Sequence, residues 1–311
     1  MKRILITGAT GFVGSNLIRH LSSQSGFLIF GHSREAARAK RSLADTQVQI
    51  VDTCSSTIFN ELQIDTVIHL AGIAHDLSNQ YNKTDYDRVN FENTKNVFDA
   101  FIRSNAKKFI FLSSIKAAID TSSTPADETI TPSPVTEYGR SKRKAEVYIQ
   151  SVNLAEGKEA YIFRPCMIHG HGNKGNLNLL YKYAKTGMPF PFGSFENKRS
   201  FLSMDNLNFI VQSFLEKDIP SGIFHLADDG ALSTKELFRL ISEELNKKPR
   251  IWHVPAAGMN GLFSMVGKRH MLDKLTEDML VSNHKLLQYI APLPLAMRDG
   301  LKKTIRSFHA A

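Results

Sequence analysis

The chain has 311 residues, 42% of them hydrophobic and 22% charged, an ordinary balance for a globular protein with one large core or two moderate ones. The formal net charge is +9, but the basic residues form short clusters without interleaved aromatic residues, so we expect a basic surface and no nucleic-acid partner. No apolar run is long enough to span a bilayer, and only two cysteines, Cys54 and Cys166, suit a reducing cytoplasmic location.

The first half of the chain alternates short β-branched runs with longer amphipathic stretches, which predicts strand–helix units. Strands are expected over residues 3–7, 27–31, 48–51, 66–70, 108–112 and 160–163. Helices are expected over residues 12–21, from a cap at Ser33 through Arg41, and over 86–105 and 136–152. Such repeated units indicate an α/β fold with a doubly wound parallel sheet of the Rossmann type over residues 1–165.

The pattern changes after Arg164-Pro165. A glycine-rich stretch at 170–175 and an apolar, proline-containing stretch at 188–193 predict loops. Helical periodicity returns over residues 178–185, 205–217, 234–246 and 297–308. We expect residues 166–311 to form a smaller, mixed α/β substrate-binding region that packs partly back on the sheet.

Three glycines stand where the first strand turns into the first helix. Gly8 permits a tight turn, Gly11 lets the backbone approach a phosphate, and Gly14 lets the helix pack close to the strand. A diphosphate would rest on the N–H groups of the helix N-terminus, which attract negative charge. The loop therefore predicts a dinucleotide site that includes the intervening residues Thr10, Phe12 and Val13.

The end of the second strand bears on which dinucleotide is bound. An acidic residue there would hydrogen-bond the adenosine ribose and favour NAD, but the sequence reads His32-Ser33-Arg34. A hydroxyl and a guanidinium can hold a 2′-phosphate, which favours NADP(H) and leaves NAD open, although Arg34 could equally belong to a solvated helix turn. Asp52, after the third strand, could meet the adenine or cap a turn.

A tyrosine and a lysine lie four residues apart in the predicted helix 136–152. Tyr138 and Lys142 therefore share one helix face. A nearby ammonium and a cationic nicotinamide would lower the pKa of the phenol, so that Tyr138 could act as general acid or base on a carbinol oxygen. Lys142 would also hold the nicotinamide ribose. Ser114, at the end of the fifth strand, could hydrogen-bond the same substrate oxygen.

Together these motifs resemble the extended short-chain dehydrogenases/reductases, in the group of nucleotide-sugar epimerases, dehydratases and ketoreductases. The resemblance covers nearly the whole chain and includes the segments 69–72, 89–94, 164–165 and 199–205. It implies an enzyme whose further cofactor contacts are Leu70, Ala71, Gly72, Asn90, Arg164 and Pro165. It also implies that Arg199, with Asn176 and Leu177, binds the diphosphate of a nucleotide sugar, for which UDP is expected.

The residues after Ser114 narrow the reaction within this group. Ile115-Lys116 replaces the Asp-Glu pair of the dehydratases and the cysteine of the 3,5-epimerases, which leaves hydride transfer at C4. Two chemistries remain open. One is reduction of a UDP-4-keto (6-deoxy, N-acetyl) hexose by NADPH, which His32-Ser33-Arg34 slightly favours; the other is 4-epimerisation of a UDP-hexose or UDP-N-acetylhexosamine on tightly bound NAD. A non-catalytic sensor or scaffold is a third reading, disfavoured because the Tyr–Lys pair is present.

Some positions depart from the family pattern or stand outside it. Cys166-Met167 occupies the place of a sugar-contacting asparagine, and His169 that of a tyrosine. His169 and His171 have no third ligand nearby, so no metal is expected. His75 and Asp76 could line the pocket. The resemblance also implies a possible homodimer through the helices 86–105 and 136–152.

Overall fold

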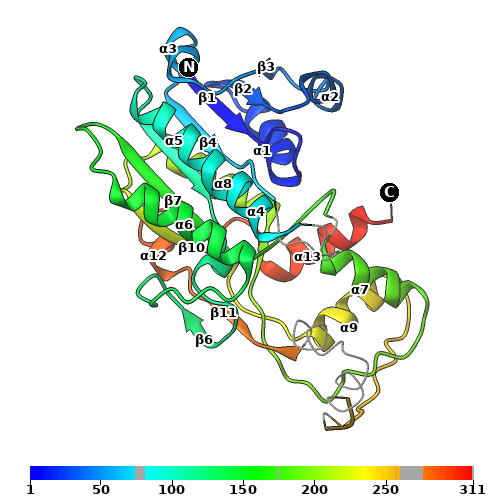
Figure 1. Cartoon of the computed structure of the whole chain (residues 1–311). Coiled ribbons are helices and arrows are strands. Elements are labelled where there is room, and N and C mark those ends of the chain that lie inside the picture. The colour runs from blue at the N-terminus through cyan, green and yellow to red at the C-terminus, as the bar shows by residue number, and fades with distance from the viewer. Residues whose placement is uncertain (74–80, 174, 256, 260–275, 310–311) are drawn as a thin grey trace.

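The computed structural model describes residues 1–73, 81–173, 175–255, 257–259 and 276–309, so His75 and Asp76 lie outside the described residues. Within these ranges a seven-stranded parallel sheet forms the centre of the molecule, in the order β10-β7-β5-β4-β1-β2-β3 (Figure 1). Its strands are β1 (Lys2–Thr7), β2 (Phe27–His32), β3 (Gln49–Val51), β4 (Thr66–His69), β5 (Lys108–Leu112), β7 (Glu159–Pro165) and β10 (Gly222–Leu226). The predicted doubly wound α/β fold is confirmed.

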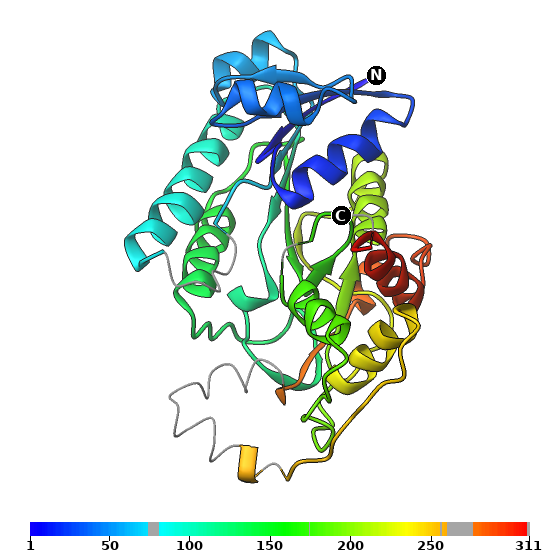
Figure 2. The same ribbon diagram turned by 90° about the vertical axis from the view of Figure 1, so that its right-hand side faces the viewer.

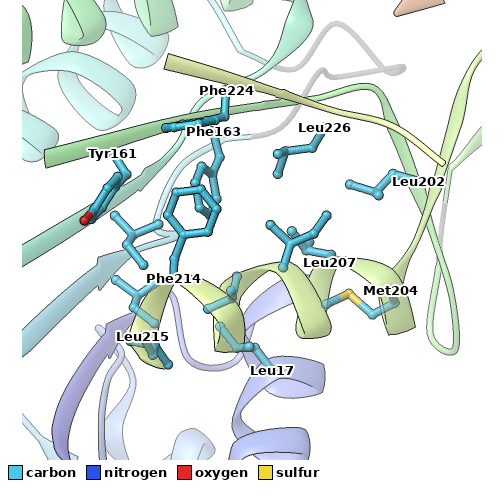
Figure 3. Packing of buried hydrophobic residues seen from close by; sticks show 14 of the residues in the cluster. Leu17, Tyr161, Phe163, Leu202, Met204, Leu207, Phe214, Leu215, Phe224 and Leu226 are labelled. Carbon is cyan, nitrogen blue, oxygen red and sulfur yellow. The ribbon is translucent and has the colours of Figure 1, made fainter. Parts of the chain in front are cut away.

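Helices cover both faces of this sheet. On one face lie α1 (Phe12–Ser22) and α8 (Met204–Glu216), and on the other α3 (Ser56–Glu61), α5 (Asn93–Ile102) and α6 (Glu137–Ser151). Alternation along β1 explains the arrangement. Ile4 and Ile6 point into the core under α1 and α8, while Leu5 points into the core under α3, α5 and α6. Figure 3 shows Phe214 of α8 against Phe163 and Phe224, with ring centroids 4.7 and 5.0 Å apart.

The predicted helix 86–105 is built from three segments. These are α4 (Lys83–Tyr86), a π-helical stretch (Asp87–Glu92) and α5. A π-helical stretch shifts the faces of the helix that follows it, and this one contains Asn90, which is fully buried. The short helix α2 (Ala36–Ser42) starts later than predicted, and Ser33 does not cap it: its Oγ lies 3.4 Å from that of Thr10.

The C-terminal region has its own small core. The helices α7 (Asn176–Lys185), α9 (Thr234–Glu244) and α13 (Met297–Ser307) share this core and gather at one end of the molecule (Figure 2). Two parallel two-stranded ladders accompany this core. The ladder of β8 (Met167–His169) with β9 (Phe201–Ser203) lies within residues 166–311, and the ladder of β6 (Ser122–Ala126) with β11 (Met279–Val281) joins this region to the first half of the chain. The short helix α12 (His284–Leu287) follows β11.

The division at residues 165 and 166 remains a proposal. Strand β10 and helix α8 both follow that boundary in the chain. Yet β10 is an edge strand of the main sheet, and α8 packs on the same face of it as α1. The sequence reading missed β10 and all four short strands of the ladders. In the part of the chain that the structure describes, no helix is both long and apolar enough to cross a membrane.

Candidate active site

A cavity of about 300 Å³ opens where the strands β1, β4, β5 and β7 end. The strand order reverses between β1 and β4, and doubly wound sheets bind their ligands at such a point. The cavity is lined by Gly8, Gly11, Phe12, Val13, Gly14, Leu70, Gly72, Ile73, Leu112, Ser113, Ser114, Tyr138, Lys142, Pro165, Cys166 and Ile168. The structure thus brings together the glycine turn and the Ser–Tyr–Lys group, which lie more than a hundred residues apart.

The glycine turn is closely packed against its surroundings. Gly8 has a φ of +69°, and a Cβ on it would lie 2.8 Å from the backbone nitrogen of Ala71. A Cβ on Gly14 would lie only 2.2 Å from the carbonyl oxygen of Gly8. Gly11 is the N-cap of α1, and no described side chain caps this helix. Its first N–H groups are therefore placed to receive an anion such as a dinucleotide diphosphate.

The residues predicted to meet the adenosine end lie outside the cavity lining. Ser33 contacts Thr10 at the end of β2, and Arg34 is exposed. Asp52 is also exposed, beside His32; burial lowers the pKa of His32, and the backbone and charge of Asp52 oppose this shift. This edge offers hydroxyl, guanidinium and carboxylate groups together, so it fits either dinucleotide.

Tyr138 and Ser114 both line the cavity. Tyr138 lies in the first turn of α6, which Thr136 caps by accepting a hydrogen bond from the N–H of Gly139. The side chains of Ser114 and Tyr138 hydrogen-bond to each other. Burial raises the pKa of Tyr138, and the hydrogen bond with Ser114 only partly offsets this shift.

The ammonium of Lys142 points to the end of β5. Its Nζ donates a hydrogen bond of 2.9 Å to the carbonyl oxygen of Leu112 and lies 4.8 Å from the ring centre of Phe111. Burial lowers the pKa of Lys142 to about 8, while the negative charge of Glu146 opposes the shift. Lys142 is thus an ammonium near neutrality that begins to lose its proton in mildly alkaline solution.

Asn90 supports the cavity wall from behind. Its Oδ1 accepts from the N–H of Ile73 at 2.8 Å, and its Nδ2 donates to the carbonyl oxygen of Ile73 at 3.0 Å and to Ser141 Oγ at 3.1 Å. A Cβ on Gly72 would lie 2.9 Å from Asn90 Oδ1 and 3.2 Å from Lys142 Nζ. Asn90 therefore holds the segment after β4 in place. Gly72 has no side chain, so the space beside Asn90 and Lys142 stays open.

Arg164 requires a correction. Its side chain is 1% exposed and forms a two-pronged ion pair with Glu146, with Nε–Oε1 at 2.9 Å and Nη2–Oε2 at 2.6 Å. The guanidinium is absent from the cavity lining, so direct contact with the cofactor is not its role; Pro165, the next residue, does line the cavity. The sequence reading overlooked Glu146, although a glutamate four residues after Lys142 shares its helix face.

The predicted diphosphate-binding residues differ in their placement. Arg199 is half-buried and donates from Nη1 to the carbonyl oxygen of Glu277 at 3.0 Å. Asn176 is the first residue of α7. Leu177 is a second correction, because its side chain is 1% exposed and packs in the C-terminal core, so only its backbone could meet a substrate.

A doubly wound sheet that ends in such a cavity defines a dinucleotide-dependent Rossmann enzyme. Comparison of the sequence with protein families places it more closely. The chain belongs to the NAD dependent epimerase/dehydratase family, whose model matches residues 4–227. The resemblance to extended short-chain dehydrogenases/reductases is thereby confirmed.

Individual relatives agree with this family. The chain is 31% identical over 317 residues to a UDP-glucose 4-epimerase of Vibrio cholerae, covering 99% of this chain and 95% of that protein. It is 30% identical over 179 residues to a UDP-2-acetamido-2,6-beta-L-arabino-hexul-4-ose reductase of Pseudomonas aeruginosa, covering 57% and 38%. The fold resembles that of the Bordetella bronchiseptica enzyme WbmG, solved with NAD and UDP, with a TM-score of 0.78, 20% identity, and 99% and 95% of the two chains covered.

Proposed function

We propose that the protein is a UDP-hexose 4-epimerase that works on a retained NAD. The observation that carries this proposal is the hydrogen-bonded pair of Ser114 and Tyr138 in the same cavity that the glycine turn lines. The likeness to the Vibrio cholerae 4-epimerase along almost its whole length supports the same reaction. We therefore place the 4-epimerase ahead of the 4-ketoreductase, whereas the sequence alone slightly favoured the reductase.

The residues present fit a dinucleotide. Gly8 and Gly14 leave backbone where a Cβ would collide, and the N-terminus of α1 faces the same cavity. When bound there, the nicotinamide supplies reversible hydride acceptance from C4. Gly8, Gly11 and Gly14 would hold the diphosphate, and Lys142 the nicotinamide ribose, because its Nζ lies beside Gly72 on the cavity wall.

Proton transfer falls to Tyr138. As a phenolate, its oxygen accepts the proton of the C4 hydroxyl as that carbon is oxidised, and returns it after the sugar has presented its other face. Ser114 donates to the same oxygen and keeps it aligned with the phenol. The ammonium of Lys142, together with the positive charge that a bound oxidised nicotinamide would supply, would favour the phenolate of Tyr138. Arg199 binds the diphosphate of UDP through its guanidinium.

A second candidate is a 4-ketoreductase that uses NADPH. The observation in its favour is the end of β2, where Ser33 and the exposed Arg34 stand in place of an acidic residue. The same Ser114, Tyr138 and Lys142 would serve that reaction, with Tyr138 as the proton donor to the C4 carbonyl. The Pseudomonas aeruginosa reductase supports this reading over part of the chain.

The same proposal includes a cytoplasmic homodimer. The cysteines Cys54 and Cys166 are both free thiols, as a reducing compartment requires. The outer face of α6 carries Val147, 48% exposed, beside an apolar hollow lined in part by Phe91 and Tyr148. Burying this face against a second copy would remove its apolar surface from water. Light scattering measures the molar mass in solution and tests the dimer. The wild-type protein should have the mass of two chains, and the variant Val147→Glu the mass of one.

The decisive experiment combines denaturation with turnover. Purified protein is denatured and the released nucleotide identified, while native protein is incubated with UDP-glucose or UDP-N-acetylglucosamine without added cofactor. Release of NAD and formation of the 4-epimer are expected, and Tyr138→Phe should abolish the second without preventing the first. Release of no NAD, together with NADPH oxidation only by a 4-keto sugar, establishes the reductase instead.

A further inference from the structure

Glu146 is a carboxylate with no exposed side-chain surface, one helical turn beyond Lys142. Four hydrogen bonds reach it. Its Oε1 accepts from Ser113 Oγ at 2.6 Å and Arg164 Nε at 2.9 Å, and its Oε2 accepts from Arg164 Nη2 at 2.6 Å and Arg143 Nη1 at 3.2 Å. An ion pair with Arg164 alone would already neutralise this carboxylate. The bond to Ser113 is therefore not needed for charge balance, and its effect is to fix the position of Ser113.

Ser113 belongs to the segment that carries the reactive hydroxyl. It lies between Leu112 and Ser114, is 3% exposed, and its backbone N–H donates to the carbonyl oxygen of Phe163 at 2.8 Å. Its side chain bonds to Glu146 of α6, and it lines the cavity next to Ser114 and Tyr138. The position of Ser113 therefore determines where the Ser114 hydroxyl stands.

Three consecutive turns of α6 form hydrogen bonds with three consecutive residues at the end of β5. Tyr138 bonds to Ser114, the next turn places Lys142 on the carbonyl oxygen of Leu112, and the third places Glu146 on Ser113. Because the residues i, i+4 and i+8 share one helix face, this register is fixed by the helix itself.

We infer that Glu146 is a positioning residue of the active site: through Ser113 it fixes the strand end that carries Ser114 against Tyr138, and Arg164 fixes Glu146 to β7. This role rests on the proposed function, since it acts on the hydroxyl pair assigned to proton transfer. Arg164 is itself steadied from β10, where His225 Nε2 lies 3.4 Å from its Nη1 and His225 Nδ1 lies 3.1 Å from the carbonyl oxygen of Ala126. The site thus depends on contacts that span three strands and a helix.

The substitution Ser113→Ala tests this role with the ion pair left intact. It removes one hydroxyl and keeps both bonds between Glu146 and Arg164. We expect kcat to fall about tenfold to a hundredfold, with KM within about twofold, because the reacting groups are displaced while the substrate contacts remain. Ser113→Thr, which restores the hydroxyl, should recover most of the rate. Ser242→Ala is the matched control, because Ser242 is also 3% exposed and hydrogen-bonded but lies in α9.

Glu146→Gln is the second variant, and it should lower kcat further if it folds, since Arg164 then loses its partner. Turnover of Ser113→Ala at the wild-type rate, or a loss that threonine does not reverse, overturns the inference. If wild-type protein converts no UDP-hexose, the proposed function fails on its own. Hydrogen exchange over residues 112–118 then decides: faster exchange in Ser113→Ala but not in Ser242→Ala supports the positioning role, and unchanged exchange overturns it.

Discussion

Replacing Gly14 with alanine would place a methyl carbon 2.2 Å from the carbonyl oxygen of Gly8, about 1.2 Å closer than the 3.4 Å at which ordinary contact begins. The same carbon would lie 3.0 Å from the carbonyl carbon of Gly8 and 3.1 Å from Ala9 Cα, so its three nearest neighbours are all backbone atoms, which cannot move aside as a flexible side chain can. The turn and the helix must separate, at an overpacking cost of about 1–3 kcal/mol of unfolding free energy. A turn displaced from the diphosphate also loses charged hydrogen bonds worth about 2 kcal/mol, or roughly thirtyfold in the Kd for NAD.

Chemical denaturation and calorimetric titration with NAD measure these two effects separately. Gly187→Ala is the control, because Gly187 also has a positive φ, +75°, but nothing lies within 4 Å of its added Cβ. That variant should lose about 1–2 kcal/mol from backbone strain and bind NAD normally. A Gly14→Ala protein with wild-type stability and wild-type NAD affinity would refute the assignment of this turn as the diphosphate site.

Three further predictions concern charge. Turnover should decline as pH rises through about 8, because the pKa of Lys142 is lowered to that value by burial and its ammonium is required; a pH–rate profile checks this. Burial lowers the pKa of His69 to about 3, below its unfolded value, so the unfolded state binds the extra proton and stability falls below pH 6.5. At pH 5 that loss is about 2 kcal/mol, and denaturation of His69→Gln at pH 5 and 7 should show a correspondingly smaller pH dependence. Arg34→Ala should leave NAD affinity unchanged; a loss of NADPH affinity alone would favour the reductase.

Local patterns were sufficient to predict six of the seven strands of the main sheet and many of the residues that line its cavity. Gly8, Gly11 and Gly14 stand at a strand-to-helix turn, and the spacing of Tyr138 and Lys142 places both on one helix face. Three of the strands that the sequence reading missed, β8, β9 and β11, have only three residues each, too few for an alternating pattern to emerge. Their existence depends on partners distant in the chain.

The two corrected residues show a second limit. The segment containing Arg164 suggested a cofactor contact, but alternation along β7 places Arg164 on the same side as Ile162, whose side chain packs in the core beneath α5 and α6. Its partner Glu146 is eighteen residues away, and nothing local joins the two. Leu177 likewise follows a helix start, yet the periodicity of α7 turns its side chain into the C-terminal core. Their positions in the sequence showed that both residues lie near the site. Only the packing shows that each side chain points into a core and away from the cavity.

In the proposed reaction a hydride leaves C4 and returns to the same carbon, while Tyr138 moves the proton. The sharpest test is incubation with UDP-glucose labelled with deuterium at C4, without added cofactor. We expect UDP-galactose that keeps the label at C4, and no product with Tyr138→Phe. Product that has lost the deuterium to solvent, or equal turnover by the phenylalanine variant, would contradict it.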